Sequence, residues 1–237
     1  MRLSDFEALT FDCYGTLIDW EQGILAELKA LTAPKGLSED EILEAFGAEE
    51  SRCEAATPDK PYPSILADVY RALGQRWALP VSQVAPIAFG GAVGRWPAFP
   101  DSAEALAHLK QHFKLVILSN VDRASFQRSN TKLGVEFDLI LTAQDIGSYK
   151  PDPRNFDHAL KELGAIGVPR ERVLHVAQSL FHDIVPAKAA GMKTVWVNRR
   201  RGKAGGGATP PASGDATPDL EVASMAELVE RHRAEAA

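Results

Sequence analysis

Short apolar runs alternate with segments of helical periodicity along most of this chain. The apolar runs, which we expect to form buried strands, occupy residues 8–11, 115–118, 139–141, 173–177 and 194–197. After Asp101 they alternate with helical patterns at residues 103–112, 124–133, 155–163 and 184–190. Such alternation is typical of repeated β-α units around a parallel sheet. The pattern therefore predicts an α/β fold with a doubly wound, Rossmann-like parallel sheet.

The first two apolar runs are separated by a long segment of different character. Apolar residues recur at helical spacing over residues 20–31, 39–54 and 65–77, and Ser38 with Glu41 fits a capping box. Pro97 and Pro100 mark the return to the core pattern. We predict a discontinuous Rossmann-like core of residues 1–19 and 97–237, with an all-helical cap domain inserted at residues 20–96.

The last part of the chain begins with a stretch rich in glycine, proline and serine. Residues 199–218 have no helical or strand periodicity and are expected to form a surface loop. Residues 219–222 then resemble a late strand, and Ser224 with Glu227 begins a terminal helix.

Composition adds limits on partners and location. With 237 residues, 45% of them hydrophobic, the chain can bury a core without disulfides, so Cys13 and Cys53 are expected to be free thiols. The net charge of −6, without a long basic run, does not indicate a nucleic-acid partner. Neither a signal peptide nor a membrane span of about 20 apolar residues is recognisable. We expect a cytoplasmic protein without a nucleic-acid or membrane partner.

Polar residues stand at the ends of the predicted strands, where doubly wound folds bind their ligands. They are Asp12, the pair Ser119 and Asn120, Lys150, and Asp183. Each alone has an ordinary explanation, as a helix cap or a solvated charge. Together they would place a nucleophile, two hydrogen-bond donors, a cation and a base in one crevice. Their order along the chain favours this functional interpretation.

The four motifs and their spacing resemble those of the haloacid dehalogenase superfamily over nearly the whole chain. In that superfamily the first motif is an aspartate nucleophile followed by a variable pair, a glycine and a threonine, and residues 12–16 match it. Ser119, Lys150 and Asp183 match the second, third and fourth motifs. The resemblance implies a hydrolase in which Asp12 is the nucleophile.

Two positions separate the possible reactions. Phosphatases of this superfamily carry a second aspartate two residues after the nucleophile, which acts as general acid and helps to hold magnesium, but here that residue is Tyr14. Gln178 stands where their fourth motif carries another aspartate. A phenol with a pKa near ~10 is a poor acid, and magnesium prefers anionic oxygens. We therefore expect no metal and no cofactor.

The sequence Asp-x-Tyr-Gly-Thr and the later Ser-Asn pair resemble type II (S)-2-haloacid dehalogenases. The resemblance implies that Asp12 displaces halide from C2 of a short haloacid and that water then hydrolyses the enzyme-bound ester. Lys150 would offset the negative charges, and Asp183 would orient Lys150 and help to activate the water. A small haloacid is the implied substrate, and a homodimer is expected because similar dehalogenases are dimeric.

The same resemblance assigns the substrate-binding groups. The backbone N–H groups of Cys13 and Tyr14, with Ser119, would bind the substrate carboxylate, and Asn120 would face the departing halide.

Three departures from the dehalogenase pattern leave alternatives. No cap arginine aligns clearly with the usual halide ligand, so Arg52 and Tyr62 are the candidates for that place. Phe156 replaces a tyrosine, and Leu180 replaces an asparagine. The alternatives are a magnesium-dependent phosphate-ester hydrolase of the same superfamily and a non-catalytic ligand-binding member.

Overall fold

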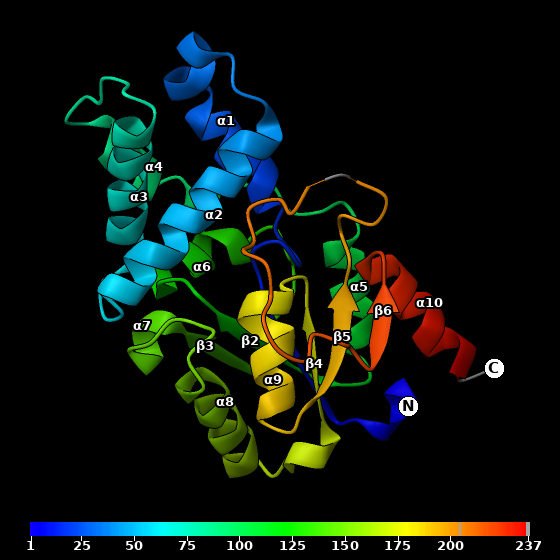
Figure 1. Cartoon of the computed structure of the whole chain (residues 1–237). Coiled ribbons are helices and arrows are strands. Elements are labelled where there is room, and N and C mark those ends of the chain that lie inside the picture. The colour runs from blue at the N-terminus through cyan, green and yellow to red at the C-terminus, as the bar shows by residue number, and fades with distance from the viewer. Residues whose placement is uncertain (204, 236–237) are drawn as a thin grey trace.

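The computed structural model describes residues 1–203 and 205–235 and is built around one parallel sheet (Figure 1). Its six strands lie in the order β3-β2-β1-β4-β5-β6, and every neighbouring pair is parallel. The strands are β1 (Ala8–Phe11), β2 (Lys114–Ser119), β3 (Leu139–Thr142), β4 (Val173–Ala177), β5 (Lys193–Val197) and β6 (Leu220–Val222). The predicted doubly wound sheet is confirmed, including the late strand.

Helices cover both faces of the sheet, as a parallel sheet requires. In β2, Leu115 and Ile117 belong to one apolar cluster, whereas Val116 and Leu118 belong to the other. The first cluster is completed by α5 (Ser102–Leu109), α6 (Arg123–Asn130) and α10 (Met225–Glu235), and the second by α8 (Arg154–Ala165) and α9 (Val185–Ala189). Because side chains alternate along each strand, the sheet contributes apolar residues to a separate core on each of its faces.

Of the five α-helices between β1 and β2 in the chain, the first four gather above the carboxyl ends of the strands (Figure 1). These inserted helices are α1 (Trp20–Thr32), α2 (Glu39–Ala56), α3 (Tyr62–Arg76) and α4 (Ala85–Gly90). The capping box at α2 is confirmed, since Glu41 N–H donates to Ser38 Oγ and Ser38 N–H donates to Glu41 Oε2. The division into domains at residues 20 and 96 stays a prediction.

Several element boundaries differ from the sequence prediction. Helix α3 begins three residues earlier than predicted, because Pro63 occupies the first turn, where its missing N–H is not needed. Helix α4 and the single turn α7 (Ala143–Ile146) were not predicted. Short 3-10 helices also occur in the described residues, at Leu3–Asp5, Ala33–Lys35, Val93–Arg95 and Arg170–Arg172.

A one-turn π-helix, η5 (Leu180–Ile184), connects β4 to α9. Asp183, which directly precedes the helical pattern predicted at residues 184–190, lies within this π-turn, and α9 starts two residues after it. Ser179 caps the turn by accepting a hydrogen bond from the N–H of His182 at 2.8 Å. Wide turns of this kind occur often at functional sites.

The loop after β5 does more than connect two strands across the surface. Ala208 in this loop is fully buried, and its carbonyl oxygen would lie 2.1 Å from a Cβ atom placed on Gly47 of α2. Only glycine permits this approach. The loop therefore packs on an inserted helix, which corrects the prediction of a simple surface connection; its residue 204 lies outside the described residues.

Among the described residues, no helix combines the length and apolar character needed to cross a bilayer.

Two glycine-to-alanine changes in helices should have opposite effects on the free energy of unfolding. Gly47→Ala should lower it by about 1–3 kcal/mol, since the added methyl collides with the Ala208 backbone. Gly164→Ala in α8 meets no atom within 4 Å and should raise it by about 0.5–1 kcal/mol through helix propensity. Urea denaturation measures both values. Equal changes in the two variants would contradict the packing described for Gly47.

Candidate functional site

The strand order places a crevice at the carboxyl end of β1. The connections from β1 lead to β2 on one side, and β4 lies on its other side, so the winding reverses there. Ligands bind at such a reversal in open α/β sheets. Asp12 follows β1 directly, Ser119 ends β2, and Asp183 follows β4 within the π-turn. The structure thus brings these predicted site residues together.

Lys150 lies at the centre of this group. Its Nζ atom is 2.9 Å from Asp12 Oδ1, 2.6 Å from Asp183 Oδ1 and 3.0 Å from the carbonyl oxygen of Leu118. The side chain is only 1% exposed. The ammonium group therefore uses its three donors on three acceptors, which lie at the carboxyl ends of the neighbouring strands β2, β1 and β4.

Asn120 fixes the position of Lys150 from the other side. Its Oδ1 accepts a hydrogen bond from Lys150 N–H at 2.6 Å, and its Nδ2 donates to the Lys150 carbonyl at 2.9 Å. Both ends of the amide are thus engaged with the backbone of the loop. In this structure Asn120 is a positioning residue, and its predicted contact with a halide stays a prediction.

Thr16 holds the second oxygen of Asp12. Its hydroxyl donates to Asp12 Oδ2 at 2.7 Å and accepts from the N–H of Gln178 at 2.9 Å. This two-sided contact fixes the hydroxyl proton toward the carboxylate. Asp12 is consequently oriented by one hydrogen bond at each oxygen, from Thr16 and from Lys150.

Asp183 is held by one oxygen and free at the other. Its Oδ1 atom is 3.0 Å from His175 Nε2, and His175 Nδ1 is 2.8 Å from Thr10 Oγ1. Its Oδ2 atom is buried and has no hydrogen-bond partner among the described residues. A buried carboxylate oxygen without a partner can accept a proton or hydrogen bond from a water molecule in the cavity.

The charges in this cluster are strongly interdependent. Burial opposes the charge on Lys150, but Asp12 and Asp183 outweigh it and raise the pKa of the ammonium group. Burial alone would raise the pKa of Asp183, yet Lys150 and His175 lower it. Burial raises the pKa of Asp12 against the opposing effect of Lys150. Lys150 is therefore charged at neutral pH, and Asp183 is ionised.

A small cavity of about 30 Å³ adjoins the cluster. The side chains that surround it come from the strand ends, α1, α2, α3 and the loop after β5: Asp12, Tyr14, Trp20, Glu50, Glu54, Tyr62, Ser119, Asn120, Lys150, Gln178, Ser179, His182, Asp183 and Thr209. Ser119 Oγ is buried without a hydrogen-bond partner among the described residues. Its free donor fits the predicted role of binding a substrate oxygen. The volume favours a small substrate.

Two buried glutamates on α2 line the same cavity and were not found from the sequence. Tyr62 Oη donates to Glu50 Oε1 at 2.6 Å, and Glu54 lies beside the Asn120 amide. Burial raises the pKa of Glu50 to about 7. Burial and the neighbouring Glu50 raise the pKa of Glu54 well above its usual range. The neutral form of Glu54 is therefore favoured, and in that form it can donate a hydrogen bond into the cavity.

Comparison with known proteins is decisive for the family. The sequence model of the family of haloacid dehalogenase-like hydrolases matches residues 6–191, which is more than half of the chain. The chain belongs to this hydrolase family.

The relatives of this hydrolase have more than one activity. This chain is 31% identical over 137 residues to the phosphoserine phosphatase of Thermus thermophilus, and the match covers 56% of this chain and 51% of that protein. It is 32% identical over 139 residues to an (S)-2-haloacid dehalogenase of Pseudomonas sp. (strain YL), covering 57% and 55%. The matches thus span about half the length of these curated relatives.

Solved structures resemble the hydrolase over nearly its full length. An L-2-haloacid dehalogenase superimposes with a TM-score of 0.78 at 25% identity, covering 96% of this chain and 99% of that one. The L-2-haloacid dehalogenase of Xanthobacter autotrophicus superimposes with a TM-score of 0.75 at 21% identity, covering 96% and 98%. At 21% identity, the similarity to the Xanthobacter autotrophicus structure shows that the two chains share a fold.

Of the two candidates for a halide ligand, Arg52 and Tyr62, one lines the cavity and the other does not. Arg52 is not part of the cavity wall: its side chain is 63% exposed and its Nε donates to Glu49 at 2.8 Å. The suggestion that Arg52 contacts the halide is therefore wrong for this structure. Tyr62 does line the cavity, although its hydroxyl is engaged with Glu50. Phe156 is fully buried and packs edge-on against His175.

The two residues after Asp12 are neutral, and Cys13 is buried whereas Tyr14 is half-buried. The phenol of Tyr14 points toward α6, where its Oη lies 3.0 Å from Ser129 Oγ, and burial raises its pKa well above the usual value. Cys13 is fully buried, and burial likewise raises the pKa of its thiol. A neutral, inaccessible thiol agrees with the packing role expected from the sequence. Binding of a carboxylate by their backbone N–H groups stays a prediction.

Proposed function

We propose that this hydrolase removes halide from short 2-haloalkanoic acids through an ester formed on Asp12. The observation that supports it best is the position of Tyr14, whose hydroxyl is turned to Ser129. A phosphatase needs an acid near this place to protonate its leaving oxygen, whereas a halide leaves without a proton. The dehalogenases among the relatives and structural neighbours agree with the proposal.

In the first step, an Asp12 oxygen attacks C2 of the substrate, and the carbon–halogen bond breaks as the new C–O bond forms. The halide departs with the bonding electron pair. Lys150 offsets the charge of Asp12 and of the incoming carboxylate, which otherwise repel each other. The free hydroxyl of Ser119 donates to the substrate carboxylate.

In the second step, water attacks the carbonyl carbon of the Asp12 ester. The unpartnered Oδ2 of Asp183 accepts a proton from this water, and the 2-hydroxy acid leaves as its C2 oxygen is protonated. Asp12 is regenerated as a carboxylate, and the net proton passes to solvent. The hydrogen bonds from Lys150 and Thr16 stabilise the charge on the Asp12 oxygens throughout.

The donor set around Asp12 favours a reaction without magnesium. Both oxygens of Asp12 accept hydrogen bonds within the protein, and Gln178 supplies an amide where a magnesium-dependent relative would need a carboxylate. Gln178 Oε1 itself accepts from the hydroxyl of Thr209 at 3.3 Å. Magnesium requires several oxygen ligands in a near-octahedral arrangement. These residues fit such an ion poorly.

Glu54 takes the place of the missing arginine in this proposal. A protonated carboxyl group in a buried cavity is a hydrogen-bond donor, and donors stabilise a departing anion. Glu54 is 5% exposed and shares the cavity with Asp12 and Ser119. The same group favours a second candidate function, because a neutral Glu54 can also protonate the leaving oxygen of a phosphate ester.

Halide release in the presence of EDTA tests the proposed function. The hydrolase should release chloride from chloroacetate or from 2-chloropropionate, and Asp12→Asn should reduce the rate by at least about 10³-fold, since the nucleophile is lost. Ion chromatography measures the chloride. Failure to release halide, together with magnesium-dependent cleavage of p-nitrophenyl phosphate, would overturn the proposal in favour of the second candidate.

The pH dependence of the rate tests the role of Glu54. Its pKa is raised above the ordinary value of a glutamate, so the donor is lost only as the pH rises through the pKa of the glutamate pair. Wild-type kcat should fall at alkaline pH. Glu54→Gln keeps an N–H donor at every pH and should flatten this fall, whereas Glu54→Ala should lower kcat by about 10²-fold at all pH values.

Glu44→Gln is the matched control, because Glu44 lies on the exposed side of the same helix. It should leave the pH profile of kcat unchanged. An alkaline fall that persists unchanged in Glu54→Gln would show that Glu54 is not the donor.

A further inference from the structure

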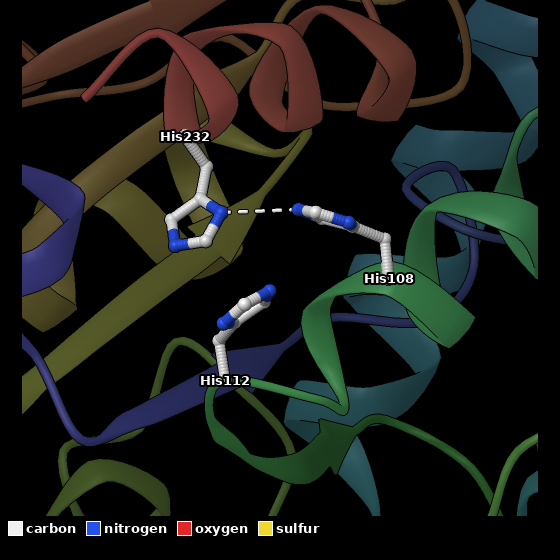
Figure 2. Close-up of side chains that lie close together, drawn as sticks. All are labelled: His108, His112 and His232. Carbon is white, nitrogen blue, oxygen red and sulfur yellow. Dashed lines mark hydrogen bonds between the residues drawn. The ribbon is translucent and has the colours of Figure 1, made fainter. Parts of the chain in front are cut away.

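Three histidines meet where α5 packs against α10, away from the cavity of the proposed active site. His108 lies on α5, His112 follows the end of that helix, and His232 lies on α10 (Figure 2). None of them lines the cavity around Asp12. Their role is therefore separate from the proposed reaction.

The three imidazole rings converge on a common point. One nitrogen from each ring lies within 4.8 Å of the others, and His108 Nε2 is 3.0 Å from His232 Nδ1. The ring centroids of His112 and His232 are 4.6 Å apart, and those of His108 and His112 are 5.0 Å apart. Bonds of about 2.0–2.1 Å to zinc place two tetrahedral ligand nitrogens about 3.4 Å apart. Small side-chain rotations would reach this arrangement.

The surroundings favour neutral rings, which are the form that binds a metal. Burial lowers the pKa of His108, and Arg233, His232 and His112 lower it further. Burial and His112 also lower the pKa of His232, against the opposing effect of Glu235. Any proton added to the cluster meets other positive charges.

We propose that His108, His112 and His232 form a site for a divalent transition-metal ion such as zinc. Imidazole nitrogen suits zinc, nickel and copper, whereas magnesium and calcium prefer oxygen ligands. Among the described residues, this is the one place where three possible histidine, cysteine or carboxylate ligands lie so close together. His112 is exposed, so water can fill a fourth position.

The ion would connect two helices that are far apart in the chain. α10 already holds the N-terminus, because Glu235 accepts hydrogen bonds from the N–H groups of Leu3 and Ser4 at 2.7 and 2.9 Å. A bond from His232 to a metal shared with α5 would fasten this terminal helix to the core. Binding to the folded state alone raises its stability.

Titration of the metal-stripped full-length protein with zinc chloride tests the site. Isothermal calorimetry should show one ion bound per chain, and zinc should raise the melting temperature by roughly 5 °C at saturating concentration. Cobalt should give the intense visible absorption of a tetrahedral site. His112→Ala removes an exposed ligand and should weaken zinc binding by about tenfold or more without disturbing the fold.

His158→Ala is the matched control, because His158 lies on α8 at the other face of the sheet. It should bind zinc as the wild type does. The absence of zinc binding in the wild type, or equal affinities in His112→Ala and wild type, would overturn the proposal. Neither readout depends on halide release, so the result is independent of the proposed reaction.

Discussion

The ammonium group of Lys150 is the interaction on which the rest of the site depends. It contacts two buried carboxylates, Asp12 and Asp183, and the carbonyl oxygen of Leu118 at the end of a neighbouring strand. Two buried carboxylates without a cation would repel each other and bind protons instead. Asn120 makes two hydrogen bonds to the backbone of Lys150 and so fixes the position of its ammonium group. Through Lys150, these bonds affect both the geometry and the charge of Asp12.

The inserted helices supply what the sheet lacks. The strand ends carry the nucleophile and the base, and the loop between α7 and α8 carries the cation. Helices α2 and α3 add Glu54, Glu50 and Tyr62 above them. These side chains close the cavity, and burial favours the neutral forms of Glu50 and Glu54. The loop after β5 joins this wall through Thr209, and its close approach at Gly47 holds α2 in place. Specificity is thus expected to lie in the insertion and the reaction in the core.

The sequence predicted the parts of the structure that local pattern determines. The strands follow from short apolar runs, and Asp12, Ser119 and Asp183 follow from their places at strand ends. Lys150, also predicted at a strand end, lies in the loop between α7 and α8. Glu50 and Glu54 were missed because a glutamate on a polar helix face has no sequence signal of burial; only the packing of α2 over the sheet encloses them. Their spacing of four residues puts them on one face, and Arg52 lies between them on the opposite side, which is why it faces solvent. The histidine cluster was missed since α10 is distant from α5 in the chain.

The central claim is that Asp12 forms the covalent ester and that water then attacks its carbonyl carbon. Repeated turnover of chloroacetate in water enriched in heavy oxygen, followed by mass spectrometry of the peptide that contains Asp12, tests this most directly. The account predicts that heavy oxygen enters the Asp12 carboxylate and that the first product molecule carries oxygen from the protein. Heavy oxygen found in the product from the first turnover, with an unlabelled Asp12, would contradict it.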